Sequence, residues 1–342
     1  MLVNSLERRH FLFLAAAAAA AGSRLSALAR ADEEQSGKPE YTRQTFVYKM
    51  VGNLEIRADV YRTAAVEVQP SILWLHGGAL MMASRGLVPP MRQLERYLAS
   101  GYTFVSIDYR LAPETKLPAI VEDMVDAYAW LRTSGPSLFN IDPDRIAVMG
   151  MSAGAYLAQL AGIRLRPRPR ALVSLYGYGD ITGPWLSRPN PGFNGTPPIS
   201  RERAYEGMTG PAIAGSPESN DPRRSTFNVY CRQSGLWTNE VSGHDPLKER
   251  SWFADYEPRM KVASRYPPTI LLHGESDQDV PFEQSVLMAR ALKKHRVEYD
   301  FVSNPRWNHA FDYAKTDPAL QEAFDRISHF LDEHLHQKTS PK

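Results

Sequence analysis

Residues 145–160 read RIAVMGMSAGAYLAQL, an apolar run, a Gly-x-Ser-x-Gly turn and a second apolar segment. The run 145–149 has the length and composition of a buried strand, and the residues from Ala155 onward are typical of the start of a helix. Gly150 and Gly154 permit a turn too tight for side chains, so the Ser152 hydroxyl is expected to project from the sheet. The following helix N-terminus favours negative charge beside it. This geometry is that of a nucleophile.

A Gly-x-Ser-x-Gly pattern is short and also occurs in ordinary turns, so the hypothesis of a nucleophile needs further support. A serine hydroxyl is a poor nucleophile near neutral pH unless a base accepts its proton. The base is usually a histidine that a carboxylate orients. The rest of the chain should therefore supply a carboxylate, a histidine and backbone donors for the developing negative charge.

The carboxylate is expected after residues 268–273, which are predicted to form a strand that runs into a turn. Open parallel sheets place their functional groups just past the carboxyl ends of the strands. Asp277 and Asp279 both lie there. Asp277 is nearer to the strand and is the favoured acid. Asp279 is the alternative, and otherwise it is expected to cap the helix that starts near Phe282.

The histidine is expected near the C-terminus. Residues 297–302 alternate like a last strand, and the loop 303–311 contains His309. The other eight histidines include one near the N-terminus and three on or just past a polar helix face. We predict His309 as the general base because of its place in the order of the chain.

Backbone donors are expected in the loop HGGAL, which starts at His76 and follows a strand predicted at 71–75. Its two glycines let the backbone approach a substrate closely. Removing one donor from an oxyanion hole typically lowers the rate about a hundredfold or more. We assign the oxyanion hole to the N–H groups of Gly77, Gly78 and Ala153, and we expect His76 to anchor the loop.

Together these motifs resemble the α/β-hydrolase superfamily, in particular its esterase and lipase branch of hormone-sensitive-lipase-like proteins and carboxylesterases. HGGAL resembles the His-Gly-Gly-Gly loop of that branch, with Ala79 in place of the third glycine. HGESDQDVP resembles the family pattern His-Gly-x-x-Asp-x-x-Val-Pro, in which Asp277 occupies the acid position. The segment DYRLAPE, from Asp108 to Glu114, resembles a motif that braces the active-site loops in the family.

Strand and helix patterns alternate along the chain, which predicts an α/β fold, the α/β-hydrolase fold, with a mostly parallel central sheet and helices on both faces. The expected strands are 46–51, 54–61, 71–75, 103–108, 145–149, 171–176, 269–273 and 297–302. The expected helices are 90–99, 119–132, 153–164, 282–295 and 317–335. Residues Val121, Met124, Val125, Tyr128 and Leu131 form an apolar stripe on the second of these helices.

The stretch 177–266 interrupts this rhythm and is rich in Pro, Gly, Ser, Asn and aromatic residues. A long aperiodic segment inside a compact domain is usually functional or disordered, and its aromatic residues argue against full disorder. We predict that it is a lid or cap insertion over the serine, within a hydrolase domain that spans 32–342. The alternative is a surface excursion packed by its own aromatic side chains.

Residues 1–31 have the charged start, apolar centre and small-residue end of a signal peptide. Two adjacent arginines followed by x-Phe-Leu resemble the twin-arginine export signal. Cleavage is expected after Ala29 or Ala31, which would leave no stable membrane span. An uncleaved anchor is disfavoured because the apolar core is shorter than the roughly 20 residues of a spanning helix. We therefore expect an exported protein, periplasmic or extracellular.

The whole chain has 40 Lys and Arg residues against 38 Asp and Glu residues. Loss of residues 1–31 removes four arginines and one glutamate and leaves 36 basic against 37 acidic residues. Nucleic-acid binding, which would favour a basic stripe, is not expected. Cys231 is the single cysteine, so no internal disulfide can form. No zinc-binding sequence pattern occurs, and we expect neither a metal nor a cofactor.

The sequence therefore predicts a serine esterase that works through an acyl-enzyme on a small-molecule or polysaccharide-linked ester. Two alternatives stay open. One is an exported serine peptidase of the prolyl-peptidase type, and the other is a catalytically inactive binding protein on the same scaffold. The motifs do not determine acyl or alcohol specificity, or the oligomeric state.

Overall fold

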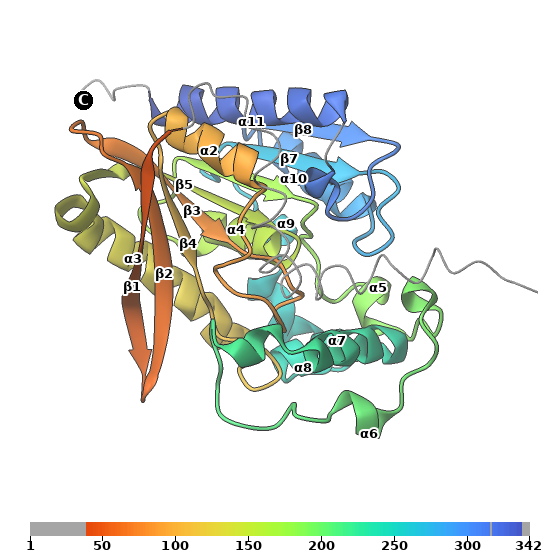
Figure 1. Cartoon of the computed structure of the whole chain (residues 1–342). Coiled ribbons are helices and arrows are strands. Elements are labelled where there is room, and N and C mark those ends of the chain that lie inside the picture. The colour runs from red at the N-terminus through yellow and green to blue at the C-terminus, as the bar shows by residue number, and fades with distance from the viewer. Residues whose placement is uncertain (1–38, 315–316, 337–342) are drawn as a thin grey trace, which may run out of the picture.

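An eight-stranded sheet lies at the centre of the part of the chain that the structure describes, residues 39–314 and 317–336 (Figure 1). The structure is a computed structural model, and the signal predicted at 1–31 lies outside its described residues. The strand order is β1-β2-β4-β3-β5-β6-β7-β8. The bounds are β1 Tyr41–Val51, β2 Leu54–Thr63, β3 Gln69–Leu75, β4 Thr103–Ile107, β5 Ile141–Met151, β6 Ala171–Leu175, β7 Thr269–Gly274 and β8 Tyr299–Asn304.

The sheet is parallel except at one edge. Strand β1 pairs antiparallel with β2, and β2 pairs antiparallel with β4, whereas the neighbouring pairs from β4 to β8 are parallel. Every residue of β3, β4, β6 and β7 is buried, because helices cover both faces of a parallel sheet. Continuous apolar runs are therefore strands here, as the sequence predicted.

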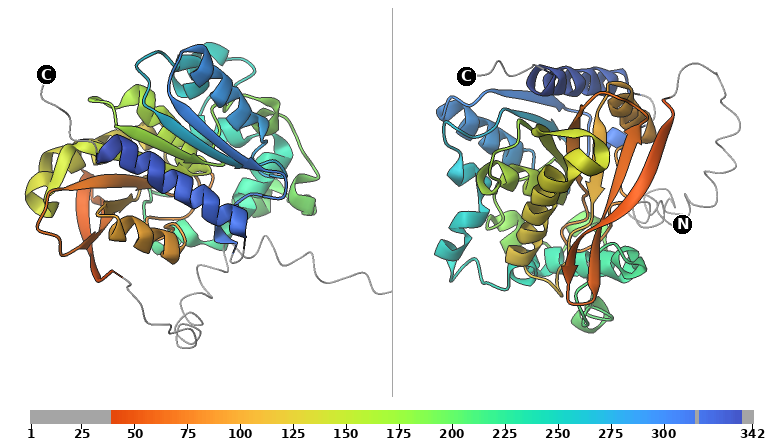
Figure 2. Two further views of the ribbon diagram at one scale, coloured as in Figure 1. Left: turned by 90° about the horizontal axis from the view of Figure 1, so that it is seen from above. Right: turned by 90° about the vertical axis from the view of Figure 1, so that its left-hand side faces the viewer.

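Helices pack on both faces of the sheet and form two separate apolar cores (Figure 2). Helices α2 and α11 lie on one face, where Leu94 and Phe324 are buried. Helices α3, α4 and α10 lie on the other, where Met124 and Leu157 are buried. The bounds are α2 Met91–Ala99, α3 Leu117–Phe139, α4 Ala153–Arg164, α10 Glu283–Lys294 and α11 Pro318–Leu335. This arrangement confirms the predicted fold class.

Helix α3 is longer than the predicted 119–132. It continues through Pro136, where a backbone N–H is missing, and it ends at Asn140 in the left-handed region with φ 54°. The last turns are buried at Gly135 and Phe139, and this packing outweighs the local preference to stop. Helix α4, in contrast, occupies the predicted residues 153–164.

The stretch 177–266 is helical rather than irregular, and it lies along one side of the sheet domain (Figure 1). Its elements are α5 Pro184–Ser187, η2 Phe193–Gly195, α6 Arg201–Ala204, η3 Pro217–Asn220, α7 Pro222–Ser234, α8 Trp237–Ser242, η4 Arg250–Tyr256 and α9 Pro258–Lys261. Phe227, Trp237 and Phe253 are buried and belong to the same apolar core as α3 and α4. The insertion is therefore packed onto the domain by its aromatic residues.

Within the described residues, no helix has the length and apolar character needed to cross a membrane.

Candidate active site

Ser152 lies in a strained turn between β5 and α4. Its backbone has φ 51° and ψ −120°, a conformation that costs on the order of 1–3 kcal/mol for a residue with a side chain. A Cβ atom at Gly150 would clash with the carbonyl of Gly154, and one at Gly154 would clash with the carbonyl of Leu75. The two glycines of the Gly-x-Ser-x-Gly turn are thus required because backbone passes where their side chains would be. The Ser152 N–H donates to the Leu175 carbonyl at 2.9 Å, which ties the turn to β6.

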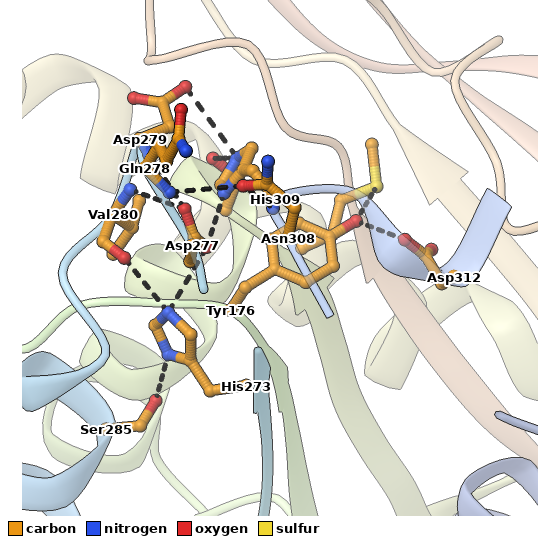
Figure 3. A network of polar contacts seen from close by, with 12 residues as sticks. Tyr176, His273, Asp277, Gln278, Asp279, Val280, Ser285, Asn308, His309 and Asp312 are labelled. Atoms are coloured by element: carbon orange, nitrogen blue, oxygen red, sulfur yellow. Dashed lines mark hydrogen bonds and ion pairs between the residues drawn. The ribbon is translucent and has the colours of Figure 1, made fainter. Parts of the chain in front are cut away.

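The structure brings Ser152, His309 and Asp277 into one hydrogen-bonded chain. Nε2 of His309 lies 3.1 Å from Oγ of Ser152, and Nδ1 lies 2.8 Å from Oδ2 of Asp277. The three residues follow β5, β8 and β7, so all lie at the same edge of the sheet. The ring of His309 is therefore placed to accept the hydroxyl proton while it donates a hydrogen bond to the carboxylate (Figure 3).

The carboxylate of Asp277 is fully enclosed by donors. Its Oδ1 accepts the N–H groups of Asp279 and Val280 at 2.8 and 2.9 Å, and Nε2 of His273 lies 3.2 Å from Oδ2 (Figure 3). Burial acts to raise the pKa of Asp277, but the charge of His309 and hydrogen bonds from both histidines outweigh it. The pKa therefore lies well below its usual range, and the group stays ionised.

Asp279 does not cap the next helix, and that expectation was wrong. The N-cap residue of α10 is Phe282, which makes no capping hydrogen bond through its side chain. Instead Asp279 binds Arg232 of α7, with Oδ1 at 2.8 Å from Nη1 and its carbonyl oxygen at 2.7 Å from Nη2. Its Oδ2 lies 3.9 Å from Nε2 of His309. The second aspartate therefore links the insertion to the neighbourhood of the histidine.

Two neighbours of His309 were not predicted from the sequence. The ring of Tyr176 lies edge-on to the imidazole, 4.7 Å between centroids, and its hydroxyl donates to Oδ1 of Asp312 at 2.7 Å (Figure 3). Burial raises the pKa of Asp312 to about 6. Burial alone would lower the pKa of His309, but the nearby carboxylates of Asp279, Asp277 and Asp312 outweigh it and raise the pKa above its ordinary value. The position of Tyr176 at the end of the strand predicted at 171–176 was the available sequence signal.

The loop that follows β3 approaches Ser152 with its backbone. Gly78 has φ 106°, and a Cβ there would clash with the Met82 carbonyl, so glycine is required. Gly77, Gly78, Ser152 and His309 line one cavity. Ala153 is the first residue of α4, so its N–H has no partner within the helix. The two glycines predicted as oxyanion donors therefore line the same cavity as Ser152, and Ala153 directly follows the serine in the chain.

His76 holds this loop in place from behind. Its Nδ1 lies 2.7 Å from the Gly77 carbonyl, so the ring is a neutral donor there. Burial lowers the pKa of His76 to about 4, which keeps it uncharged. Tyr109 stacks on the ring at 4.1 Å and donates its hydroxyl to the His76 carbonyl at 2.7 Å. These contacts fit the anchoring role expected for His76.

The segment Asp108–Glu114 touches the same loop at further points. The N–H of Ala112 donates to the Leu80 carbonyl at 2.8 Å. Glu114 binds Arg224 of α7 with two contacts of 2.9 and 2.8 Å, and the Arg224 guanidinium also donates to the Met81 carbonyl. The segment thus joins the glycine loop to the insertion, which agrees with the bracing role that the family resemblance implied.

We predict that Arg224→Leu lowers the free energy of unfolding by about 3–5 kcal/mol, because it leaves the buried carboxylate of Glu114 without its partner. The side chains of Arg224 and Glu114 are 2% and 4% exposed, so water cannot replace the lost contacts. Denaturant unfolding of the purified variant measures the loss. The control is Arg223→Leu, whose half-exposed side chain pairs with Asp221 at the surface and should cost less than about 1 kcal/mol. Equal losses in both variants would contradict the prediction.

A cavity opens from Ser152 toward the insertion. Its volume is about 130 Å³, and its mouth is open to solvent. Sheet-domain residues line one part of it, and Trp185, Arg232 and Trp237 of the insertion line another. Within the described residues no group of three or more His, Cys, Asp or Glu side chains is arranged to hold a metal ion.

The chain belongs to the alpha/beta hydrolase fold family, whose family model matches residues 72–313. The match extends from β3, ahead of the glycine loop, past His309. It therefore covers the serine turn, both aspartates and the whole insertion.

Among curated proteins, the chain is similar to part of the non-reducing polyketide synthase mapC' of Penicillium brevicompactum, with 30% identity over 329 residues. It is also similar to part of the non-reducing polyketide synthase Preu6 of Preussia isomera, with 28% identity over 309 residues. These matches cover 82% and 81% of this chain but only 15% and 14% of the two synthases. The chain thus corresponds to a small part of much longer proteins.

Solved structures share the fold. A Staphylococcus aureus protein of unknown function has a TM-score of 0.67 at 22% identity, covering 86% of this chain and 99% of its own. EstE1, a carboxylesterase from a metagenomic library, has a TM-score of 0.64 at 24% identity, covering 93% and 95%. An acetyl ester-xyloside bifunctional hydrolase from Caldicellulosiruptor lactoaceticus has a TM-score of 0.61 at 22% identity, covering 87% and 98%.

Proposed function

We propose that the protein is a serine esterase, which hydrolyses carboxylic esters through an acyl-enzyme intermediate. The observation that carries the proposal is the unbroken chain of contacts from Ser152 through His309 to Asp277. A hydroxyl, an imidazole and an ionised carboxylate in this order activate a nucleophile on unrelated folds. EstE1, a carboxylesterase, and the Caldicellulosiruptor acetyl ester-xyloside hydrolase share the fold and point the same way.

In the proposed reaction Oγ of Ser152 attacks the ester carbonyl while Nε2 of His309 accepts its proton. Asp277 holds the resulting imidazolium through Nδ1. The carbonyl oxygen becomes negative and is bound by the N–H groups of Gly77, Gly78 and Ala153. The imidazolium protonates the leaving alcohol, and a water activated by His309 then attacks the acyl-enzyme and frees Ser152.

The proposal extends to the substrate and the location of the enzyme. A cavity with an open mouth suits a small-molecule ester or an ester carried on a polysaccharide. The insertion 177–266 acts as a cap that shapes the cavity. The leader 1–31, with its paired arginines, directs the chain to the periplasm or the extracellular space. Fractionation of cells that express the full chain checks the location.

The direct test is hydrolysis of p-nitrophenyl acetate and butyrate by the purified protein, followed by the absorbance of the released p-nitrophenolate. We expect saturable turnover of both esters. Aminoacyl-proline amides serve as the comparison, because a prolyl peptidase would cleave them. Cleavage of the amides without ester turnover would contradict the proposed function.

The acid limb of the pH profile is expected to depend on Asp279. His309 acts as a base only when neutral, so activity is present above its pKa and lost as the pH falls through it. Burial lowers that pKa, and the charge of Asp279 is the largest single effect that raises it. Asp279→Asn should therefore move the acid limb of kcat/KM to lower pH. Asp300→Asn, in an ion pair with Arg326 away from the site, is the control and should leave the limb in place. An unmoved or upward-shifted limb in Asp279→Asn would show that the prediction is wrong.

A further inference from the structure

The insertion contributes a polar face to the cavity beside Ser152. Ser225, Asn228 and Arg232 of α7 all line the cavity, and their spacing of three and four residues puts them on one face of the helix. Trp185 of α5 lies against this face, because the Arg232 guanidinium is 5.0 Å from its ring centroid. Two separate helices thus bring these side chains to one wall.

Three of these side chains hold a buried polar atom with no hydrogen-bond partner in the described part of the chain. The atoms are Oδ1 of Asn228, Nε1 of Trp185 and Nε of Arg232. Asn228 is 5% exposed and Arg232 is 7% exposed, so solvent has little access to them. Native structures rarely leave buried polar atoms unpaired, and the reaction at Ser152 uses none of these three. The side chains that carry these atoms line the cavity, which makes the atoms candidate partners for a ligand there.

The one cation named on this wall is already paired with a carboxylate. Arg232 is paired with Asp279 at 2.8 Å, and Asp221 also lines the cavity. A carboxylate on a ligand would meet these two acidic side chains, which disfavours an anion. A hydroxyl group can both donate to the Asn228 oxygen and accept from the Trp185 N–H, so it matches the unpaired atoms.

Aromatic rings flank the polar face. Tyr178 makes an edge contact with Trp185 at 5.1 Å between centroids and another with Trp237 at 6.1 Å. All three residues line the cavity. Flat apolar surfaces of this kind favour packing with an aromatic ring of a ligand. The wall therefore combines surface for a ring with partners for a hydroxyl on that ring.

We propose that this wall is a specificity subsite for a hydroxyaryl group on the acyl or the alcohol side of the ester. The proposal rests on the esterase function given above. Asn228 accepts the hydrogen of the ring hydroxyl, and Trp185 donates to its oxygen. An ester that lacks the hydroxyl leaves both groups unpaired and is the poorer substrate.

Two matched ester pairs test the subsite. Methyl phenylpropanoate is compared with methyl para-hydroxyphenylpropanoate, and phenylethyl acetate with para-hydroxyphenylethyl acetate, with products quantified by chromatography. The hydroxylated ester of at least one pair should have a kcat/KM roughly tenfold higher. A ratio near one in both pairs, or no turnover of the four esters by protein that hydrolyses p-nitrophenyl acetate, overturns the subsite. Failure on p-nitrophenyl acetate as well would instead reject the esterase function.

Substitutions of two wall residues test whether the preference for the hydroxylated ester comes from this wall. Asn228→Leu keeps a branched side chain and Trp185→Phe keeps an aromatic one, but each removes one hydrogen-bonding group and should bring the ratio toward one. Asn239→Leu makes the same change as the first on α8, outside the cavity lining, and should keep the wild-type ratio. Circular dichroism shows whether each variant is folded. If Asn228→Leu does not fold, Trp185→Phe alone tests the assignment. A wild-type ratio in the folded variants of both cavity residues overturns the assignment.

Discussion

Ser152→Ala is expected to lower kcat for p-nitrophenyl acetate by on the order of 10⁵- to 10⁶-fold. The alanine has no hydroxyl to form the acyl-enzyme, so only binding and the oxyanion donors still assist attack by water. The change removes one oxygen from a side chain that lines the cavity. Its effect should therefore appear in kcat and leave the melting temperature near that of the wild type.

The control for this variant is Ser137→Ala, at an exposed position on α3 that precedes β5, whereas the turn follows the other end of that strand. It should keep wild-type turnover. The residual rate of p-nitrophenyl acetate hydrolysis is measured with highly purified Ser152→Ala protein. The stability of the same variant is measured by differential scanning calorimetry. Turnover within about tenfold of wild type in the folded variant would remove Ser152 from the reaction.

Asp277→Asn is expected to lower kcat by about 10³- to 10⁴-fold. The wild-type carboxylate accepts from Nδ1 of His309, which leaves Nε2 free to take the serine proton. An amide can donate to Nδ1 instead and so favours the wrong tautomer. It also removes the negative charge that stabilises the imidazolium. The loss should therefore lie in the chemical step.

The matched control for Asp277→Asn is Asp279→Asn, two residues further along the same loop. Asp279 lies 3.9 Å from Nε2 of His309 and does not hold Nδ1, so its substitution should move the pH profile but retain most of the maximal rate. A larger loss of kcat in Asp279→Asn than in Asp277→Asn would reverse the assignment of the acid. Both rates are measured on the pH plateau of each variant.

Local patterns predicted the parts of the site that depend on short segments. The Gly-x-Ser-x-Gly turn could be recognised as a short motif, although the space at Gly154 is limited by the carbonyl of Leu75 on a different strand. The bounds of α4 followed from the same segment. Asp277 and His309 could be proposed because each comes just after a strand, and parallel strands end at one edge of the sheet.

Contacts between distant segments could not be predicted in this way. Arg232 and Asp279 are 47 residues apart, and Tyr176 and Asp312 are 136 residues apart, so no local pattern links them. Helix α7 was missed because its residues divide between the apolar core, at Phe227, and the polar wall of the cavity. A helix with two buried faces of opposite character shows no single apolar stripe.

The central claim is that Ser152 is an activated nucleophile, and labelling with a fluorophosphonate tests it most directly. Such a reagent forms a covalent bond with an activated serine in a single turnover and needs no knowledge of the natural ester. Intact-protein and peptide mass spectrometry should find one adduct per chain, on Ser152, and none on Ser152→Ala. An unlabelled wild-type protein that is folded, or equal labelling of Ser152→Ala, would contradict the account.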